Sequence, residues 1–492
     1  MQVICNTNCY ETDGKIPLLT LLQLNGSHIS APCGGKGTCQ KCRVFLISGK
    51  VKTPEGEVVA PNSILACESY PLEDCAIAVM SESIEVETND IPDELSPFSF
   101  NLGMAVDIGT TTIAIDFYDL DEGIRVVTEG VTNRQRAMGA DVITRVEYAI
   151  NHGNEALTRS VVYSINDAVQ SVQAKYGIYA NNIKQAVVSG NSIMLHLLCD
   201  CDVSKMAQTP YQMSESFGIT KKARELGLKI NPDADVYIAP CPAAFVGADI
   251  ALGVMTSGML YTDETTLLVD IGTNGEIALC HRGKLYCAAT AAGPAFEGAN
   301  IEFGMAACEG AISEVFEKND TLMVGVIGGG TPKGICGSGL LDAISVGLDI
   351  GAIDETGLLI GDDGYYLDIN SGIEITQRDV REVQLAKSAI CSGIATLVEY
   401  AEISFETIDK VLLAGGFGAK LNINSACAIG LIPYKLKNKI YHIGNSSLKG
   451  AGEVLVNPAK RYEAEAICRD MEYIELADSE FFSSAFIENM MF

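Results

Sequence analysis

Short apolar runs alternate with helical patterns along the chain beyond residue 103. The runs are rich in β-branched residues and end in glycine-containing turns, which predicts buried strands. Between two of them, apolar residues recur every three or four positions from Leu157 to Val172, as on an amphipathic helix. This alternation predicts an α/β architecture. The predicted strands are residues 104–109, 112–120, 185–190, 266–272 and 410–416.

The first 90 residues differ from the rest because they contain seven of the 17 cysteines. The stretch that follows, TNDIPDELSPFSFN, has two prolines, three acidic residues and no basic residue, which is typical of a linker. We therefore expect a domain at residues 1–87, a linker at 88–102 and a larger domain at 103–492.

One motif occurs twice within the larger domain. Asp107-Ile-Gly-Thr-Thr-Thr and Asp270-Ile-Gly-Thr-Asn-Gly each follow a predicted buried strand, and they lie 163 residues apart. A motif that recurs in this way indicates two related subdomains.

The composition excludes several classes of protein. With 48% hydrophobic and 20% charged residues among 492, the chain is globular rather than disordered. Its 63 acidic and 34 basic residues give a net charge of −29, so we expect no nucleic-acid partner and no binding to a membrane surface.

No uninterrupted apolar run reaches the roughly 18 to 20 residues of a bilayer span. The N-terminus lacks the order of a signal peptide, so we expect a cytoplasmic protein whose cysteines are thiols, metal ligands or redox centres.

Four cysteines have the spacing of an iron–sulfur site. Cys33, Cys39 and Cys42 form C-x5-C-x2-C, and Cys67 follows after 24 intervening residues. Glycines between the first two cysteines allow a tight loop that wraps a cluster and points backbone N–H groups at its sulfurs. Cys75 is the alternative fourth ligand, and a structural zinc site or unconnected thiols are alternatives for the whole group.

The pattern around these cysteines resembles a plant-type ferredoxin. Strands are predicted at 2–6, 42–49 and 75–80, with a short helix at 16–26, which is the order of a β-grasp ferredoxin domain. The resemblance favours Cys67 as the fourth ligand because it precedes the last strand. It implies a 2Fe–2S cluster that carries one electron at about −400 mV.

The repeated motif has the chemistry of a phosphate site. A strand that ends in Asp can hold Mg²⁺ by its carboxylate, and the small turn after it offers N–H and hydroxyl donors to phosphate oxygens. Two such turns could close on a triphosphate from opposite subdomains, and a glycine-rich turn after a third strand could admit adenosine. We expect Mg²⁺ at Asp107 and Asp270, phosphates at Asp107, Gly109, Thr110, Thr111, Thr112, Gly272, Thr273, Asn274 and Gly275, and adenosine at Gly415, Gly416 and Gly418.

These three motifs, in this chain order, resemble those of the superfamily of sugar and acetate kinases, heat-shock ATPases and actin. The resemblance implies a two-subdomain, actin-like ATPase domain that binds ATP. Two other interpretations compete: each turn could merely end a strand, or it could belong to a Rossmann dinucleotide site. Neither turn follows G-x-G-x-x-G, and the sequence contains no GxxxxGK[ST] P-loop.

A general base for ATP hydrolysis is expected among the carboxylates of the glycine-containing loops. Glu297, Glu302 and Asp249 lie in such loops, where one of them could orient the attacking water. A cap or turn role is the alternative for each of the three. We select Glu297 for the catalytic role.

A ferredoxin domain joined by a linker to this ATPase fold resembles the reductive activators of corrinoid proteins. Further segments agree with that family, among them GADVITRVEYA at 139–149, VSGNSIMLHLL at 188–198 and AAGPAFEGANIEFGM at 291–305. The resemblance covers nearly the whole chain. Gly103 opens the ATPase domain almost directly after the linker, so we expect a short form that lacks the middle domain of larger members.

The resemblance implies ATP-dependent, one-electron reduction of Co(II) to Co(I) in a corrinoid protein of a methyltransferase system, supplied by an upstream low-potential electron donor. Two functions from other classes compete with it. A small-molecule kinase with a redox-sensing ferredoxin domain would transfer phosphoryl groups to an acid or sugar, whereas an electron carrier would use a non-hydrolysing ATPase half only for docking. The sequence leaves the oligomeric state open, a homodimer included.

Overall fold

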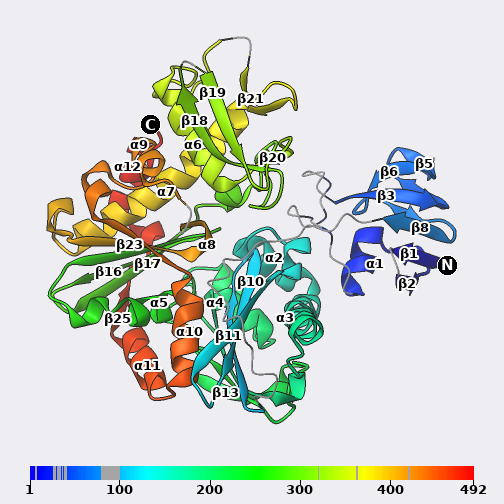
Figure 1. Ribbon diagram of the computed structural model, residues 1–492, viewed down its shortest axis with the longest axis horizontal. Coiled ribbons are helices and arrows are strands. Elements are labelled where there is room, and N and C mark those ends of the chain that lie inside the picture. The colour runs from blue at the N-terminus through cyan, green and yellow to red at the C-terminus, as the bar shows by residue number, and fades with distance from the viewer. Residues whose placement is uncertain are drawn as a thin grey trace.

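The computed structural model describes residues 1–5, 8–25, 29, 31, 35, 37, 42–78, 100–319, 321–361, 364–418 and 421–492. Two predicted cluster ligands, Cys33 and Cys39, and most of the predicted linker therefore lie outside the described residues. Figure 1 shows a small N-terminal domain beside two larger lobes.

The N-terminal domain is a five-stranded sheet, in the order β2-β1-β8-β3-β6, with one helix against it. The helix is α1 (Leu18–Leu24), and its buried leucines form a core with alternate residues of the strands, such as Val44 and Leu46. This is the predicted β-grasp arrangement. The strands are β1 (Gln2–Cys5), β2 (Asn8–Glu11), β3 (Arg43–Ser48), β6 (Asn62–Leu65) and β8 (Cys75–Ala78), and a small second sheet holds β4 (Lys50–Thr53), β5 (Gly56–Val59) and β7 (Tyr70–Pro71).

The first lobe is built on a six-stranded sheet in the order β11-β10-β9-β12-β14-β13. Its central strands, residues 102–108 and 183–190, are mostly buried because helices cover the sheet. The predicted amphipathic helix forms α3. The elements are β9 (Leu102–Ile108), β10 (Thr112–Asp119), β11 (Ile124–Thr132), η1 (Arg134–Ala137), α2 (Val142–His152), α3 (Glu155–Tyr176), β12 (Ile183–Gly190), α4 (Ser192–Leu198), β13 (Ile219–Lys222), β14 (Asp235–Ile238) and α5 (Ala248–Ser257).

The second lobe has another six-stranded sheet, in the order β24-β23-β15-β16-β17-β25, and smaller sheets above it. Its main elements are β15 (Thr266–Ile271), β16 (Gly275–His281), β17 (Lys284–Thr290), η6 (Pro294–Glu297), α6 (Gly337–Asp349), α7 (Gln377–Tyr400), β23 (Lys410–Ala414), α8 (Gly415–Gly418), α9 (Ile423–Ala428), β24 (Ile440–Gly444), α10 (Ser446–Val456), α11 (Lys460–Asp470), β25 (Met471–Tyr473) and α12 (Glu480–Glu488). The smaller sheets contain β18 (Ala311–Lys318), β19 (Thr321–Val326), β20 (Gly334–Ile335), β21 (Tyr365–Asp368) and β22 (Ile373–Ile375).

The two large sheets repeat one topology. In each, the first two strands form an antiparallel hairpin, the third strand pairs outside the second, and two later strands add in parallel on the other side of the first. The repeated DIGT motif forms the turn of the hairpin, between β9 and β10 and between β15 and β16. The predicted pair of related subdomains is therefore confirmed.

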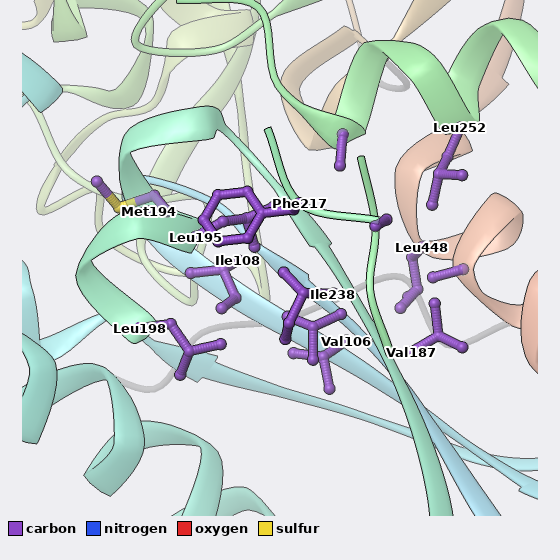
Figure 2. Packing of buried hydrophobic residues seen from close by; sticks show 14 of the residues in the cluster. Val106, Ile108, Val187, Met194, Leu195, Leu198, Phe217, Ile238, Leu252 and Leu448 are labelled. Carbon is purple, nitrogen blue, oxygen red and sulfur yellow. The ribbon is translucent and has the colours of Figure 1, made fainter. Parts of the chain in front are cut away.

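Helices α5 and α10 lie between the two sheets and share one core with the first. Figure 2 shows Val106, Val187 and Ile238 of the first sheet among side chains from α4, α5 and α10, including Leu252 and Leu448. Fully burying such side chains stabilises the fold by roughly 1.5–3 kcal/mol each. The strand ends that carry the two turns are thus fixed on a rigid core. In the described part of the chain, no helix is long and apolar enough to cross a membrane.

Candidate functional site

A cavity of about 620 Å³ lies between the two lobes, where both DIGT turns meet. Its walls come from the ends of β9, β15 and β23 and from the start of α10. Most of the residues selected from the sequence line it together, although they come from segments far apart in the chain. These are Asp107, Gly109, Thr110, Thr111, Thr112, Asp270, Gly272, Thr273, Asn274, Glu297, Gly415 and Gly416.

Two of the selected glycines do not line the cavity. Gly275 begins β16, where an added Cβ would meet the hydroxyl of Thr290 at 2.6 Å and the side chain of Ile390 at 2.7 Å. Gly418 packs beneath Leu413, and its carbonyl oxygen is bonded by His442 Nδ1 at 2.6 Å. Close packing therefore accounts for Gly275, whereas an added Cβ at Gly418 would make only ordinary contacts with Leu413, at 3.7 Å or more.

In each DIGT turn, the N–H of the glycine donates to a backbone carbonyl further along the turn. The N–H of Gly109 donates to the carbonyl of Thr112, three residues on, at 3.0 Å, whereas the N–H of Gly272 donates to the carbonyl of Asn274, two residues on, at 3.0 Å. An added Cβ at Gly109 would lie 2.6 Å from Thr112 O, so this tight turn has no space for a side chain there.

Glu297 connects the two turns across the cavity. Its carboxylate accepts hydrogen bonds from Thr273 Oγ1 at 2.6 Å and from Thr111 Oγ1. Burial raises the pKa of Glu297, although the Thr273 bond and the charges on Arg136 and Arg145 oppose the rise. A carboxyl group with a raised pKa between two phosphate turns is a stronger proton acceptor than an ordinary carboxylate.

Two aspartates end the strands that lead into the turns. Asp107 accepts hydrogen bonds from Asn445 Nδ2 at 2.8 Å and from Ser447 Oγ at 2.7 Å, and burial raises its pKa. Burial, and then the charge on Asp107, raises the pKa of Asp270 to about 7. The two carboxylates are therefore close enough to repel each other.

Two further carboxylates lie in the same region: Asp249, which the sequence offered as an alternative general base, and Glu276, which the sequence analysis missed. Burial, then the charges on Asp270 and Asp107, raises the pKa of Asp249 to about 8. Burial, then the charges on Asp249 and Asp270, raises the pKa of Glu276 well above its usual range. Asn191 Nδ2 donates to Glu276 Oε1 at 2.6 Å.

This arrangement fits Mg²⁺. In the described residues, no three His, Cys, Asp or Glu side chains form a ready metal-binding group. Mg²⁺ does not need one, because it is commonly bound by one or two carboxylates together with water and substrate phosphates. A divalent cation beside Asp107 and Asp270 would remove the repulsion between them.

The glycine-rich end of β23 forms the far side of the cavity. Gly415 has φ +84°, and an added Cβ there would overlap Oδ1 of Asp270, so only glycine is accommodated. Beyond it, the ring of Phe417 stacks on that of Phe296, with centroids 5.3 Å apart and an interplanar angle of 2°. A narrow apolar wall next to a bare backbone is suited to a nucleoside.

The first turn is held from behind by residues that the site prediction missed. Arg145 is fully buried, and its Nη2 donates to Thr110 O at 2.5 Å. Asn133 donates to the carbonyls on either side of Thr110. Its backbone N–H donates to Thr111 O and its side-chain Nδ2 donates to Gly109 O, both at 2.9 Å. Burial, then the charge on Arg136, lowers the pKa of Arg145 to about 9. The GADVITR segment contains this arginine, but nothing local in the sequence shows that it is buried.

Asn191 and Asn445 had a sequence signal that could have found them. The tripeptide Gly-Asn-Ser occurs at 190–192 and at 444–446, each time between a strand and a helix. In both places the asparagine oxygen caps the helix, and its amide donates to a carboxylate of the cavity.

The N-terminal domain brings two of the selected cysteines together. Cys42 Sγ and Cys67 Sγ are 3.2 Å apart, and both residues are buried. Gly37 has φ +74°, and an added Cβ there would overlap the carboxylate of Glu68, next to Cys67. Two buried thiols this close together fit an iron–sulfur cluster. Cys75 lies within β8, and burial raises the pKa of its thiol to about 11.

The two-lobed fold with its phosphate turns, joined to a ferredoxin-like domain, defines a class: an actin-like ATPase with a 2Fe–2S domain at its front. The family models that match the chain agree with each part. They describe a 2Fe-2S iron-sulfur cluster binding domain at residues 6–72, the RACo middle region at 102–262 and the C-terminal ASKHA domain of RACo at 264–492.

Known relatives cover most of the chain. The corrinoid activation enzyme RamQ of Eubacterium limosum is 34% identical over 418 residues, which is 79% of this chain and 70% of the relative. The [Co(II) methylated amine-specific corrinoid protein] reductase of Methanosarcina barkeri is 25% identical over 425 residues, which is 78% of this chain and 76% of the relative. A solved structure of a reductive activator for corrinoid, iron-sulfur protein superposes with a TM-score of 0.74 at 29% identity, covering 100% of this chain and 98% of that one. This chain belongs to the family of corrinoid reductive activators.

The expectation of a short form without the middle domain is wrong. The middle region of the family matches residues 102–262, which form the first lobe. The first DIGT turn lies inside this region, so a segment that we assigned wholly to the ATPase domain is also the family's middle region.

Proposed function

We propose that this chain couples ATP hydrolysis between its lobes to the one-electron reduction of Co(II) in a corrinoid protein, which yields Co(I). The observation that carries the proposal is the single cavity lined by both phosphate turns and by buried carboxylates. It belongs to a chain whose first domain holds Cys42 and Cys67 side by side. Relatives named for corrinoid activation and for Co(II) corrinoid protein reduction support the choice of substrate.

The proposed roles divide between the two sites. When bound, the cluster carries one electron and Mg²⁺ neutralises phosphate charge. Asp107 and Asp270 would hold the cation, and Glu297, whose pKa is raised by burial, would accept a proton from the attacking water. The other assignments are Cys33, Cys39, Cys42 and Cys67 to the cluster, Gly109, Thr110, Thr111, Thr112, Gly272, Thr273 and Asn274 to phosphates, and Gly415 and Gly416 to adenosine.

An energy source is needed because we expect the Co(II) centre to accept its electron at a lower potential than the cluster supplies. Each 59 mV of such a gap is tenfold in the equilibrium constant, so a few hundred millivolts is several kcal/mol. ATP can offset this only by binding two states of the protein with different affinity. The two lobes must therefore have different arrangements with and without nucleotide.

The partners follow from the same chemistry. An upstream low-potential donor must return an electron to the cluster after each reduction. We expect this to take place in the cytoplasm, where thiols stay reduced, and away from anionic membrane surfaces, which the charge of −29 would repel.

The test combines the cluster-loaded protein, a low-potential reductant, ATP and a Co(II) corrinoid protein, and it follows the absorbance of Co(I). We expect Co(I) to appear only with ATP and phosphate to be released without any other acceptor. An equal rate of Co(I) formation without nucleotide would contradict ATP coupling. Phosphoryl transfer to an acid or sugar would favour the kinase, and reduction without hydrolysis would favour the electron carrier.

A matched pair of variants tests the cluster assignment. Cys67→Ser should abolish the visible spectrum of the cluster and the reduction of Co(II), while ATP binding persists. Cys75→Ser should retain both, because Cys75 lies inside strand β8. A spectrum lost in Cys75→Ser and retained in Cys67→Ser would assign the fourth ligand to Cys75.

A further inference from the structure

The N-terminal domain touches the first lobe through helix α1, which lies beside α2 and α3 in Figure 1. Gln23 Nε2 donates to Ala137 O, at the end of η1, at 2.8 Å. Leu24 of α1 and Met138 of the first lobe line the same narrow seam. The contact is partial, since Leu24 keeps 42% of its surface exposed. Contacts of this kind between domains allow the domains to separate.

The other end of α1 is bonded to the segment that carries Cys67. The N–H of Leu18 donates to Ser69 O at 2.8 Å, and the N–H of Leu19 donates to Ala66 O at 2.9 Å. These two acceptors stand on either side of Cys67. The position of α1 therefore fixes the orientation of this predicted cluster ligand relative to the first lobe.

On the lobe side, the seam is made by the same segment that holds the first phosphate turn. Residues 133–145 donate hydrogen bonds to three consecutive carbonyls of that turn. Asn133 donates to the carbonyls of Gly109 and Thr111, and Arg145 donates to the carbonyl of Thr110. Ala137, the acceptor of the bond from Gln23, lies between Asn133 and Arg145 in the chain. A single segment is thus bonded to the N-terminal domain on one side and to the phosphate turn on the other.

We propose that nucleotide binding in the cleft and docking of α1 on residues 133–145 stabilise each other. Carbonyls bonded from behind fix the orientation of the turn, so a contact that orders residues 133–145 preorganises the turn for phosphate. Coupling of this kind is reciprocal: if docking strengthens nucleotide binding, the nucleotide strengthens docking by the same factor. Loss of the nucleotide then releases the N-terminal domain from the first lobe. This inference rests on the proposal that the cleft binds ATP.

The first test measures the affinity of the cluster-loaded, full-length chain for a non-hydrolysed ATP analogue by calorimetry. The double variant Gln23→Ala/Leu24→Asp removes the bond to Ala137 and places a charge in the seam, away from the cavity. We expect it to bind the analogue at least about fivefold more weakly than the unaltered chain. Gln2→Ala, an exposed glutamine of the same domain outside the seam, is the matched control and should bind normally.

An unchanged affinity in the double variant, with the visible spectrum of the cluster retained, would overturn the coupling. A second measurement needs no variant: hydrogen exchange of residues 18–24 in the unaltered chain, with and without the analogue. We expect exchange there to slow when the analogue binds. Protection confined to the cleft would also overturn the coupling, whereas failure of the unaltered chain to bind any adenine nucleotide would instead overturn the proposed function.

Discussion

The first phosphate turn, residues 109–112, and the second, residues 272–275, come from equivalent hairpins but have different surroundings. The first is held from behind by Asn133 and Arg145, whose segment also meets the N-terminal domain. The second follows Asp270, which abuts the glycine-rich end of β23. One turn is therefore tied to the redox domain and the other to the predicted adenosine side.

The largest expected effect comes from removing either aspartate. Asp107→Asn and Asp270→Asn should each lower ATP hydrolysis by roughly 100-fold or more, because a buried carboxylate beside the metal is lost. Their effects on stability should differ. Without Mg²⁺, Asp270→Asn should raise Tm by a few degrees relative to Asp107→Asn, since only Asp107 accepts bonds from both Asn445 and Ser447.

Steady-state hydrolysis and thermal unfolding measure the two effects. Full activity in either variant would remove that aspartate from the metal site. Equal Tm values for both would mean that the hydrogen bonds of Asp107 do not distinguish the two strand ends.

The next largest effect is expected from Arg145→Met. This change removes one support of the first turn and leaves the second turn unaltered. The change leaves the carbonyls of Thr110 and Gly139 without their buried donor. We expect unfolding to become easier by about 2–4 kcal/mol and nucleotide affinity to fall about 30-fold. Urea unfolding and calorimetry measure these values. Arg469→Met, at an exposed site, is the control, and equal behaviour of the two variants would show that the buried support is dispensable.

Gly415→Ala tests the surroundings of the second turn, because Gly415 lies against Asp270, the first residue of that turn's motif. A methyl group at this positive-φ position would press on Asp270. We expect about a tenfold loss of nucleotide affinity and about 1–2 kcal/mol of stability. Without nucleotide, Gly416→Ala meets open space and should lose much less stability, so equal losses of stability in the two variants would argue against contact with Asp270 as the cause.

The last expected effect is a pH dependence specific to the second aspartate. Burial, and then the charge on Asp107, raises the pKa of Asp270 from 3.8 to about 7. The folded chain holds this proton more tightly than the unfolded chain, so the stability it contributes is present below about pH 4 and is lost as pH rises through about 7.

Without Mg²⁺, the free energy of unfolding of the unaltered chain should therefore fall relative to that of Asp270→Asn between about pH 4 and 7. Urea unfolding at several pH values measures this difference, and Mg²⁺ should reduce it. Parallel curves for the two proteins would mean that Asp270 titrates normally.

Local sequence patterns predicted much of the fold and part of the site. The strands around Asp107 and Asp270 are long apolar runs that end in a tight turn, so their place and type follow from the residues themselves. Cysteine spacing indicated the N-terminal domain in the same way. The order of strands in each sheet also agrees with the repeat seen in the sequence.

The support around the turns could not be predicted because it depends on contacts between distant segments. Asn445 reaches Asp107 across 338 positions, and the burial of Arg145 depends on packing against Gln135 and Met194. Gly275 has a different explanation. It belongs to the repeated motif, but packing against Thr290 and Ile390 rather than a ligand requires it.

Glu297 offers a consequence for spectroscopy. Its two carboxylate oxygens each accept a hydrogen bond from a hydroxyl group, one from either lobe, so the vibrational frequencies of this carboxylate depend on how far apart the lobes stand. A phosphate that enters between Thr111 and Thr273 must compete for both hydroxyls. The infrared carboxylate bands of Glu297 are thus a native label of cleft width, readable in a difference spectrum without any attached probe.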